Sequence, residues 1–379
     1  MKSSGLGLIG LSHVQFAVHD LERAHKLYEE RFGFRPVYRS SRAVEEKEGQ
    51  KSVVYLGGDA RIMVTQSLRE NSDAARFLRL HPEGVMTVAF NVKSVDAAFK
   101  TLESRQGTPI ADATDVDGQK EFEIATPLGE VNFRFIERKD HTQFAPGWDA
   151  IKAPARPGAV PWIGIDHITS NLRTMRPLID WYRHVMGFEQ FWEIQFHTTM
   201  TAAGKTKDSG TGLKSIVMWD PESQIKFATN EPLRPFFRQS QIERFVVDNR
   251  GPGVQHIALS VPRIIDAVDW LQAKGFKFLA APATYYEMLG ARLKSVGWDV
   301  EKIREPMAEL KKRNILVDGS SEGYMLQIFQ EELKAVDGRE EAGPAFFEII
   351  QRAGDRGFGY GNFRALFEAI EAAQSSRKD

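Results

Sequence analysis

The sequence predicts an α+β protein made of two related halves, each containing β-α units followed by further strands. Three observations support this prediction. The chain repeats its own order of strand and helix patterns, a proline-rich stretch separates the two copies, and 379 residues exceed the size of one ordinary hydrophobic core.

The first pair of matching segments begins at Gly10 and Gly164. Each starts with a Gly-x-x-His motif, which places His13 and His167 at the same point of the repeat. Each then alternates like a strand, continues as an amphipathic helix and reaches a Gly-Phe pair before another strand. We therefore expect both halves to open with the same strand-helix-strand unit.

Two further pairs of segments complete the repeat. Residues 84–106 and 253–275 both begin with Gly-Val in a strand and continue into a helix with apolar residues three and four apart. Residues 130–138 and 345–352 both form a strand that ends in Arg. Each half is therefore predicted to hold two β-α units and additional strands.

These matches predict an N-terminal structural domain over 1–145, a linker over 146–161 and a C-terminal catalytic domain over 162–379. The linker contains Pro146, Pro154, Pro157 and Pro161. The second half is longer, mainly through the polar stretch 201–212 and a charged helical segment around 286–313. The chain ends with a glycine-rich turn and an amphipathic helix, expected to form a lid over the site, although such turns also simply cap helices.

Composition excludes several functional classes. With 50 basic and 51 acidic residues the net charge is −1, so we expect no nucleic-acid partner. The chain has no cysteine, which excludes disulfides, zinc thiolates, iron–sulfur clusters and a thiol nucleophile. No apolar run approaches the roughly 18 residues of a membrane span. The N-terminal sequence does not read as a signal peptide, so we expect a cytoplasmic protein without a membrane partner.

The repeat also identifies a candidate metal site. His167, His256 and Glu348 lie in three different predicted strands of the second half, whereas the first half has His13, Thr87 and Arg134 at the matching points. Two imidazoles and one carboxylate can occupy one face of an octahedron and leave three positions for substrate and O₂, as in non-haem Fe(II) oxygenases. Zinc lacks the redox chemistry that O₂ activation requires.

A single histidine in a strand is more often structural than a ligand. We assign a structural role to six histidines, namely His13, His19, His25, His81, His141 and His184. The role of His197 is left open. Glu348 is harder to dismiss, because it stands within the apolar run 346–350. Burial of an unpaired carboxylate costs several kcal/mol, so a central strand would require a cation beside it.

Six segments in order resemble 4-hydroxyphenylpyruvate dioxygenases of the vicinal-oxygen-chelate superfamily. They are GVQHIAL (253–259), TYY (284–286), ILVD (315–318), EGYMLQIF (322–329), FFEIIQR (346–352) and GFGYGNF (357–363). The resemblance is dense over 160–370 and weaker before it. It implies βαβββ modules that pair into open, glyoxalase-like barrels, with Fe(II) bound by His167, His256 and Glu348.

The resemblance also implies a reaction from tyrosine and phenylalanine catabolism. 4-Hydroxyphenylpyruvate and O₂ would yield homogentisate and CO₂, and the substrate's own 2-oxo acid would chelate the iron. The protein would supply coordination, orientation of the substrate and a dry pocket. We expect a homodimer or homotetramer, since this module often pairs.

The family's pocket residues carry over one at a time. The polar lining falls on Gln255, Gln327, Asn230 and Gln241, which are implied to be catalytic, and on Ser215, which is implied to bind substrate. An aromatic wall for the substrate ring falls on Phe329, Phe358, Phe363 and Phe367. Each polar residue could instead be exposed or a cap, with even odds for Gln241. Phe363 and Phe367, four residues apart, could be ordinary core contacts.

The sequence departs from the family pattern at Ala228, Thr229, Glu243 and Pro252 and across 197–212. These departures concern the fit of the substrate more than the iron site. The nearest alternative is a 4-hydroxymandelate synthase, which would oxidise the benzylic carbon; Phe329 favours ring hydroxylation. An extradiol catechol dioxygenase would lack the QIF strand and the GFGxGNF segment. A non-catalytic small-molecule binding protein of the same fold would take up no metal.

Overall fold

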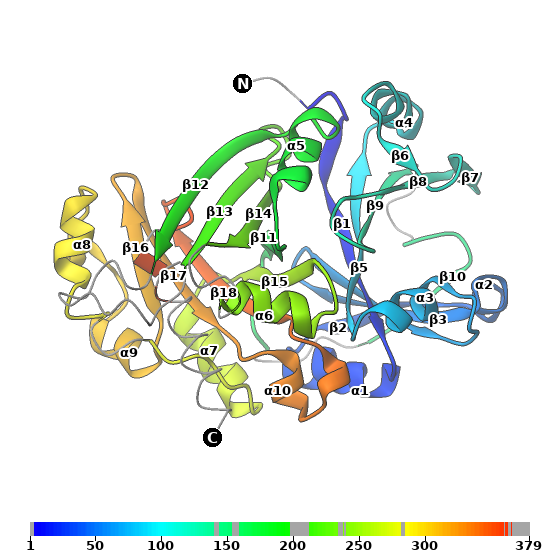
Figure 1. The fold of residues 1–379 in the computed structure, drawn as a ribbon. Helices are drawn as coiled ribbons and strands as arrows, with labels where there is room; N and C mark the ends of the chain where they lie inside the picture. Colours follow the sequence, from blue (N-terminus) through cyan, green and yellow to red (C-terminus); the bar gives the residue numbers. More distant parts are fainter. Residues whose placement is uncertain are drawn as a thin grey trace.

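The computed structural model describes residues 4–139, 144–153, 159–197, 212–233, 238, 240–281, 285–359, 361, 362 and 365. Two curled sheets with helices at their sides and ends make up the molecule, one from each half of the chain (Figure 1). The predicted α+β class is therefore confirmed.

The N-terminal sheet has ten strands in the order β10-β2-β3-β4-β1-β5-β9-β8-β6, with β7 beside β8. Its strands are β1 (Leu8–Val18), β2 (Arg35–Ser40), β3 (Gln50–Gly57), β4 (Ala60–Ser67), β5 (Gly84–Val92), β6 (Thr108–Pro109), β7 (Thr114–Val116), β8 (Gln119–Ala125), β9 (Asn132–Arg138) and β10 (Trp148–Ala150). The helices of this half are α1 (Leu21–His25), which continues as a π-helix, α2 (Arg42–Glu48), α3 (Asp73–Leu80) and α4 (Val95–Ser104).

The C-terminal sheet has eight strands in the order β12-β13-β14-β11-β15-β18-β17-β16. Its strands are β11 (Gly164–Asn171), β12 (Glu189–His197), β13 (Gly212–Trp219), β14 (Lys226–Pro232), β15 (Gly253–Ser260), β16 (Leu316–Ser320), β17 (Gly323–Phe329) and β18 (Phe346–Ala353). The helices here are α5 (Arg176–His184), α6 (Gln241–Asp248), α7 (Ile264–Ala273), α8 (Leu289–Ser295), α9 (Met307–Lys312) and α10 (Leu333–Asp337).

Strand pairing confirms that the halves are duplicated. In the first half β1 runs parallel to β4 and antiparallel to β5, and β5 runs parallel to β9. In the second half β11 runs parallel to β14 and antiparallel to β15, and β15 runs parallel to β18. The same four-strand arrangement thus forms the centre of both sheets.

Three predicted segments have particular outcomes. The beginning of the expected linker forms β10, whose Trp148 pairs with Ser40 of β2, so these residues extend the N-terminal sheet. The charged segment around 286–313 contains α8 and α9. Of the expected helix after the glycine-rich turn, only 361, 362 and 365 are described, and nearly all of 201–212 lies outside the described residues. The domain boundaries themselves remain predictions.

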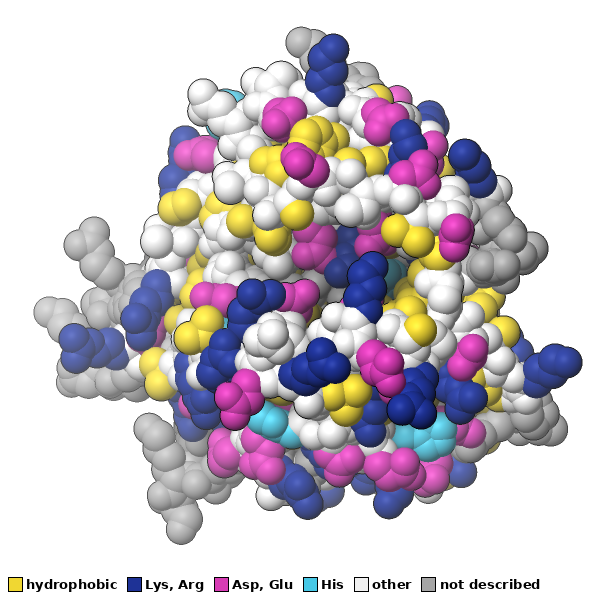
Figure 2. All heavy atoms as spheres, turned by 90° about the vertical axis from the view of Figure 1, so that its right-hand side faces the viewer, with side chains coloured by type: hydrophobic (Ala, Val, Ile, Leu, Met, Phe, Trp, Pro, Cys, Tyr) yellow, Lys and Arg dark blue, Asp and Glu magenta, His cyan; other side chains and the backbone are white. Residues whose placement is uncertain are grey.

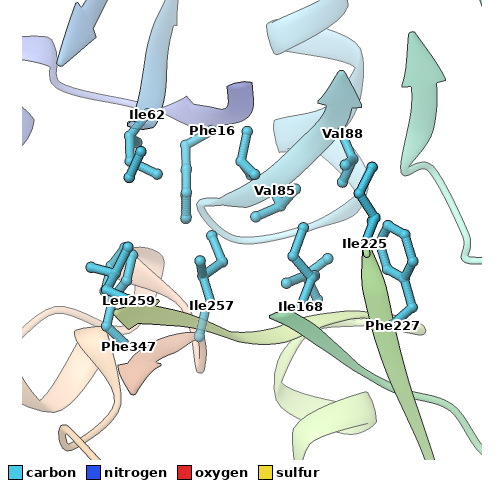
Figure 3. Packing of buried hydrophobic residues seen from close by; sticks show 14 of the residues in the cluster. Phe16, Ile62, Val85, Val88, Ile168, Ile225, Phe227, Ile257, Leu259 and Phe347 are labelled. Carbon is cyan, nitrogen blue, oxygen red and sulfur yellow. The ribbon is translucent and has the colours of Figure 1, made fainter. Parts of the chain in front are cut away.

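The main hydrophobic core lies between the two sheets (Figure 3). Phe16, Ile62, Val85 and Val88 of the first sheet face Ile168, Ile257, Leu259 and Phe347 of the second. Successive side chains of a strand point to opposite faces. Because Ile168, Ile257 and Phe347 point into this core, their neighbours His167, His256 and Glu348 point to the concave inside of the C-terminal sheet. Among the described helices, none is both long and apolar enough to span a membrane.

Candidate metal centre

Three adjacent strands bring the candidate ligands together. In the order β11-β15-β18, His167 pairs with Ala258 across one strand boundary, and Glu348 pairs with the same Ala258 across the other. His256 lies two residues before Ala258 on the central strand and therefore on the same face. The three side chains converge above the small side chain of Ala258.

The ligand atoms form a compact, buried cluster. One nitrogen of each histidine and one oxygen of Glu348 all lie within 4.8 Å of one another. Oε2 of Glu348 is 3.4 Å from Nε2 of His167 and 3.4 Å from Nε2 of His256. The residues are only 3%, 3% and 1% exposed, so the cluster is shielded from bulk water.

A β-bulge residue next to each histidine orients its ring. The pairing of β11 with β15 skips Asp166 and, further along, Gln255. Oδ1 of Asp166 is 2.8 Å from Nδ1 of His167, and Oε1 of Gln255 is 3.0 Å from Nδ1 of His256. Both oxygens are acceptors, so each Nδ1 carries the proton and each Nε2 presents a lone pair to the centre. Bulges re-aim side chains next to active sites in this way.

Asp166 is itself fixed by Arg352 at the end of β18. The Nε and Nη2 atoms of Arg352 donate to the two carboxylate oxygens of Asp166 at 2.6 and 2.7 Å. Burial favours the neutral carboxyl, but Arg352 and His167 outweigh it and hold the pKa of Asp166 well below its usual range. Arg352, Asp166 and His167 are therefore linked in a series of hydrogen bonds behind the centre.

The carboxylate ligand is positioned from the other side. Nε2 of Gln327 on β17 donates to Oε1 of Glu348 at 2.7 Å, which leaves Oε2 for the centre. Nδ2 of Asn362 donates to Oε1 of Gln327 at 2.8 Å, and the Tyr285 hydroxyl donates to Oδ1 of Asn362. This second chain connects the glycine-rich turn to the ligand set.

The electrostatics of the cluster favour a bound cation. Burial alone would raise the pKa of Glu348, but His167 and His256 outweigh that effect and lower it to about 2. Burial lowers the pKa of His256, although Glu348 opposes this. For His167, Glu348 and Asp166 overcome burial and raise the pKa. Glu348 is therefore ionised at neutral pH, and a cation bound at the centre would balance its charge.

The expected polar pocket residues lie on the same concave face. Ser215 of β13 pairs directly with Asn230 of β14. Oγ of Ser215 and Oδ1 of Asn230 are buried and have no hydrogen-bond partner within the described part of the chain. Nδ2 of Asn230 donates to Asn171, and Gln241, the first residue of α6, accepts from Nε2 of Gln255 at 3.2 Å. Buried polar atoms without partners indicate a place for a ligand.

Aromatic rings pack around the histidines. Phe358 lies edge-on to His167 with ring centroids 4.8 Å apart, and Phe329 lies 6.1 Å from His256. Phe346, which the sequence did not single out, stacks on His256 at 4.9 Å. Phe363 and Phe367 lie outside the described residues, so their expected role stays a prediction.

The departures from the family pattern have structural settings. Glu243 on α6 accepts from Nε of Arg173 at 3.0 and 2.9 Å, so its charge is directed to that partner. Ala228 packs against Phe358 in a small cluster. Thr229 is buried. The carbonyl of Pro252 accepts from Asn249 and lies close to Gly129 of the other half.

The matching points of the N-terminal half also carry over into the structure. His13 pairs with Ala89, Gln15 pairs with Thr87, and Arg134 pairs with Ala89. In the second half, Thr169 pairs with His256 in the same way, and Ala258 pairs with both His167 and Glu348. Arg134 thus stands where Glu348 would be, and it is paired with Glu123. Among the other histidines, His81 and His25 are held by protein partners, and His141 and the side chain of His197 lie outside the described residues.

Asp166, Arg352 and Asn362 are supporting residues that the sequence pattern did not reveal. Two of them left a signal, since Asp166 precedes a candidate ligand and Arg352 ends a repeated strand. Their contacts depend on bulges and on chain segments far apart in sequence, which a repeat pattern does not reveal.

The chain is similar to known proteins over most of its length. The Glyoxalase/Bleomycin resistance protein/Dioxygenase superfamily matches residues 10–133 and 164–306. A 4-hydroxyphenylpyruvate dioxygenase of Dictyostelium discoideum is 32% identical over 97% of this chain and 99% of its own length. One of Coccidioides posadasii is 35% identical, with 97% and 94% covered.

A solved structure supports the same fold. A triple mutant of 4-hydroxymandelate synthase from Streptomyces coelicolor superposes with a TM-score of 0.79 at 24% identity, covering 97% of this chain and 99% of that one. Identity at that level establishes the fold alone. The near-complete coverage by relatives above 30% identity decides the family, and this chain belongs to the 4-hydroxyphenylpyruvate dioxygenase family.

Proposed function

We propose that this chain is an Fe(II)-dependent 4-hydroxyphenylpyruvate dioxygenase that converts 4-hydroxyphenylpyruvate and O₂ to homogentisate and CO₂. The observation that carries the proposal is the buried cluster of His167, His256 and Glu348 in a chain of this family. The first half, with Thr87 and Arg134 at the matching points, is proposed to be structural with respect to this reaction.

The donor set fits a non-haem iron. It consists of two imidazole nitrogens and one carboxylate oxygen, and the side chains behind them fix which atoms face the centre. Three protein ligands leave room for a substrate that chelates and for O₂. When bound, Fe(II) would supply the redox chemistry that activates O₂ and drives loss of CO₂ and hydroxylation.

The chain's own residues would bind and orient the substrate. The 2-oxo acid end would lie at the triad, and the phenol would reach the unpaired oxygens of Ser215 and Asn230. Neutral groups suit a phenol because they donate and accept without adding a charge that competes for the metal. Phe358 and Phe329 would flank the ring and keep water out.

The alternative product is 4-hydroxymandelate, from the same substrate and metal. The likeness to 4-hydroxymandelate synthase is one of fold and does not favour this product. Phe329, buried beside His256, supports ring hydroxylation because it restricts where the ring can lie. Product analysis separates the two reactions.

The test is anaerobic reconstitution of the metal-free chain with Fe(II), followed by 4-hydroxyphenylpyruvate and air. Oxygen uptake is recorded, and the product is identified by chromatography and mass. Formation of homogentisate supports the proposal. Formation of 4-hydroxymandelate would leave the fold and the metal site as proposed and show that the pocket orients the substrate differently. Reconstitution with Zn(II), which has no redox chemistry, is the control and should consume no oxygen. Iron binding without oxygen uptake would refute the assignment of 4-hydroxyphenylpyruvate as the substrate. Absence of iron binding would favour a non-catalytic binding protein.

We further propose a cytoplasmic homodimer or homotetramer, in line with the family. Light scattering after size exclusion measures the assembly, and a monomer at micromolar concentration would contradict it.

A further inference from the structure

The N-terminal half contains a cavity of its own. It has a volume of about 470 Å³ and lies on the concave side of the first sheet, where His13, Gln15, Arg134 and Arg138 line it together with Phe144. Figure 2 views this half from its outer side, and charged side chains of both signs surround a hollow near the middle of that face. The cavity occupies the place that corresponds to the metal centre of the second half.

Two buried polar atoms in this cavity lack partners. Nε2 of His13 and Oε1 of Gln15 have no hydrogen bond to any described residue. The two residues are 2% and 1% exposed. Buried polar groups normally have hydrogen-bond partners. One ring nitrogen and one amide oxygen without partners in the same cavity therefore indicate a ligand that accepts one hydrogen bond and donates another.

The residue behind His13 reverses the protonation pattern of the metal centre. Ser12 is the bulge residue of β1, as Asp166 is the bulge residue of β11. Nη1 of Arg138 donates to Oγ of Ser12 at 3.1 Å, and Oγ is 3.1 Å from Nδ1 of His13. With Arg138 donating to Oγ, the Ser12 hydroxyl is free to donate its own proton to Nδ1. Nε2 of His13 would then carry a proton and donate into the cavity, whereas Nε2 of His167 offers a lone pair.

The charge of the cavity also differs from that of the metal centre. Arg134 is paired with Glu123. Arg138 donates to three neutral oxygens, on Phe144, Ser12 and Asn91, and no described carboxylate forms an ion pair with it. Burial, together with Arg61 and Arg134, lowers the pKa of Arg138 to about 10 although Glu121 opposes this, so its positive charge is only partly compensated.

Carboxylates also line the cavity and reduce its excess of positive charge. Glu48, Asp73 and Glu121 line the cavity, against five Lys or Arg residues. The balance is therefore positive, and the under-compensated cation, Arg138, is linked through Ser12 to the donor face of His13. Phe144 adds an apolar wall, with its ring 5.1 Å from that of His13.

We infer that this cavity binds a small organic carboxylate that also bears a hydroxyl group, with His13 and Arg138 as the anion-binding residues. The carboxylate would accept from Nε2 of His13, the hydroxyl would donate to Oε1 of Gln15, and the apolar part would lie on Phe144. Ser12 and Arg134 stand where the second half has Asp166 and Glu348, so the corresponding place in the first half would bind an anion instead of a cation. This inference does not depend on the iron chemistry proposed for the second half.

Binding is tested by calorimetry on the metal-free full chain with 4-hydroxyphenylacetate, an acid without a keto group. 4-Hydroxyphenylacetamide, of the same shape without the charge, should not bind. Arg138→Gln and Ser12→Asp should each weaken binding at least tenfold. Arg42→Gln makes the same charge change as Arg138→Gln at a position 91% exposed and outside the cavity, and should leave binding unchanged. His256→Ala, which disrupts the second half, should also leave it unchanged.

The ring of His13 gives a second measurement, which is made on the unmodified chain; a variant is needed only to assign the signal. Imidazole ¹⁵N spectra, with His13 assigned through His13→Phe, should show the Nε2–H form and a shift of that signal on addition of the acid. Loss of binding in His256→Ala with retention in Arg138→Gln would place the acid in the second half and overturn the inference. An Nδ1–H form, no binding of the acid, or binding of inorganic phosphate in its place would also overturn it.

Discussion

Gln327 and Glu348 are directly hydrogen-bonded: Nε2 of Gln327 donates to Oε1 of Glu348 at 2.7 Å, while Oε2 faces both histidines. The residues belong to adjacent antiparallel strands, β17 and β18. The contact decides which carboxylate oxygen is available to a metal, so Gln327 acts directly on the candidate ligand.

Gln327→Leu should weaken metal binding about 10- to 100-fold, the usual effect of losing a group that orients a ligand. The reason is that Oε1 loses its donor and Glu348 can rotate. Competition with a chelator under anaerobic conditions measures the affinity. Gln330→Leu, which removes another buried amide just beyond β17, is the matched control and should bind metal normally. Equal affinities in the two variants would contradict the orienting role.

Asp166→Asn should also weaken metal binding about 10- to 100-fold, because the anchor of His167 loses its charge. It removes the nearer ionic partner of buried Arg352 and leaves only Asp355 at 3.9 Å, so the free energy of unfolding should fall by about 3 kcal/mol. Asp180→Asn breaks the exposed pair with Arg176 and should cost at most about 1 kcal/mol. Denaturant titration of both variants compares the two losses; similar values would show that the Arg352–Asp166 pair is not structurally important.

Ser215→Ala should raise KM for 4-hydroxyphenylpyruvate about 3- to 10-fold, the equivalent of one hydrogen bond of roughly 0.5–1.5 kcal/mol. The buried Oγ of Ser215 has no described partner and is proposed to meet the phenol. Ser170→Ala is the control, since Ser170 is equally buried but lies on the opposite face of β11 from His167. Steady-state kinetics with both variants separates a pocket effect from a general one.

Phe347→Ala should lower the free energy of unfolding by about 3–5 kcal/mol, because a buried ring between the sheets leaves a cavity. Phe347 contacts Phe32 of the first half with ring centroids 4.8 Å apart. We expect both halves to unfold in one transition, with the whole transition shifted. Leu80→Ala, at a position 52% exposed, should change little. Separate transitions for the two halves would show that the shared core does not couple them.

The neutral, buried ring of His13 should lower the stability of the metal-free protein as the pH falls below about 6.5. Burial, with Arg134, Arg138 and Arg61, holds the pKa of His13 well below its usual value, so this ring stays neutral in the folded chain. The unfolded chain takes up the proton, which favours unfolding by up to about 1.4 kcal/mol per pH unit. His13→Phe should reduce this slope between pH 6.5 and 5, as measured by denaturation at several pH values. His184→Gln, on an exposed part of α5, serves as control, and an equal slope in both variants would refute the assignment.

The duplication, the α+β class and the three candidate ligands could all be predicted from the sequence. These follow from periodic apolar patterns and from residues at matching points of a repeat, which are local signals. Ile168, Ile257 and Phe347 alternate with His167, His256 and Glu348, so burial of the first set fixes the direction of the second.

The atoms of those ligands that face the centre could not be predicted from the sequence. That choice depends on the bulges at Asp166 and Gln255 and on Gln327 of a neighbouring strand, and on the Arg352 side chain reaching across β15 to Asp166. The structure also places Ser12, which accepts from Arg138, beside Nδ1 of the equivalent histidine of the first half. A hydrogen bond requires a donor–acceptor distance that is correct to within a few tenths of an ångström. Sequence spacing does not specify the distance between atoms far apart in the chain so closely.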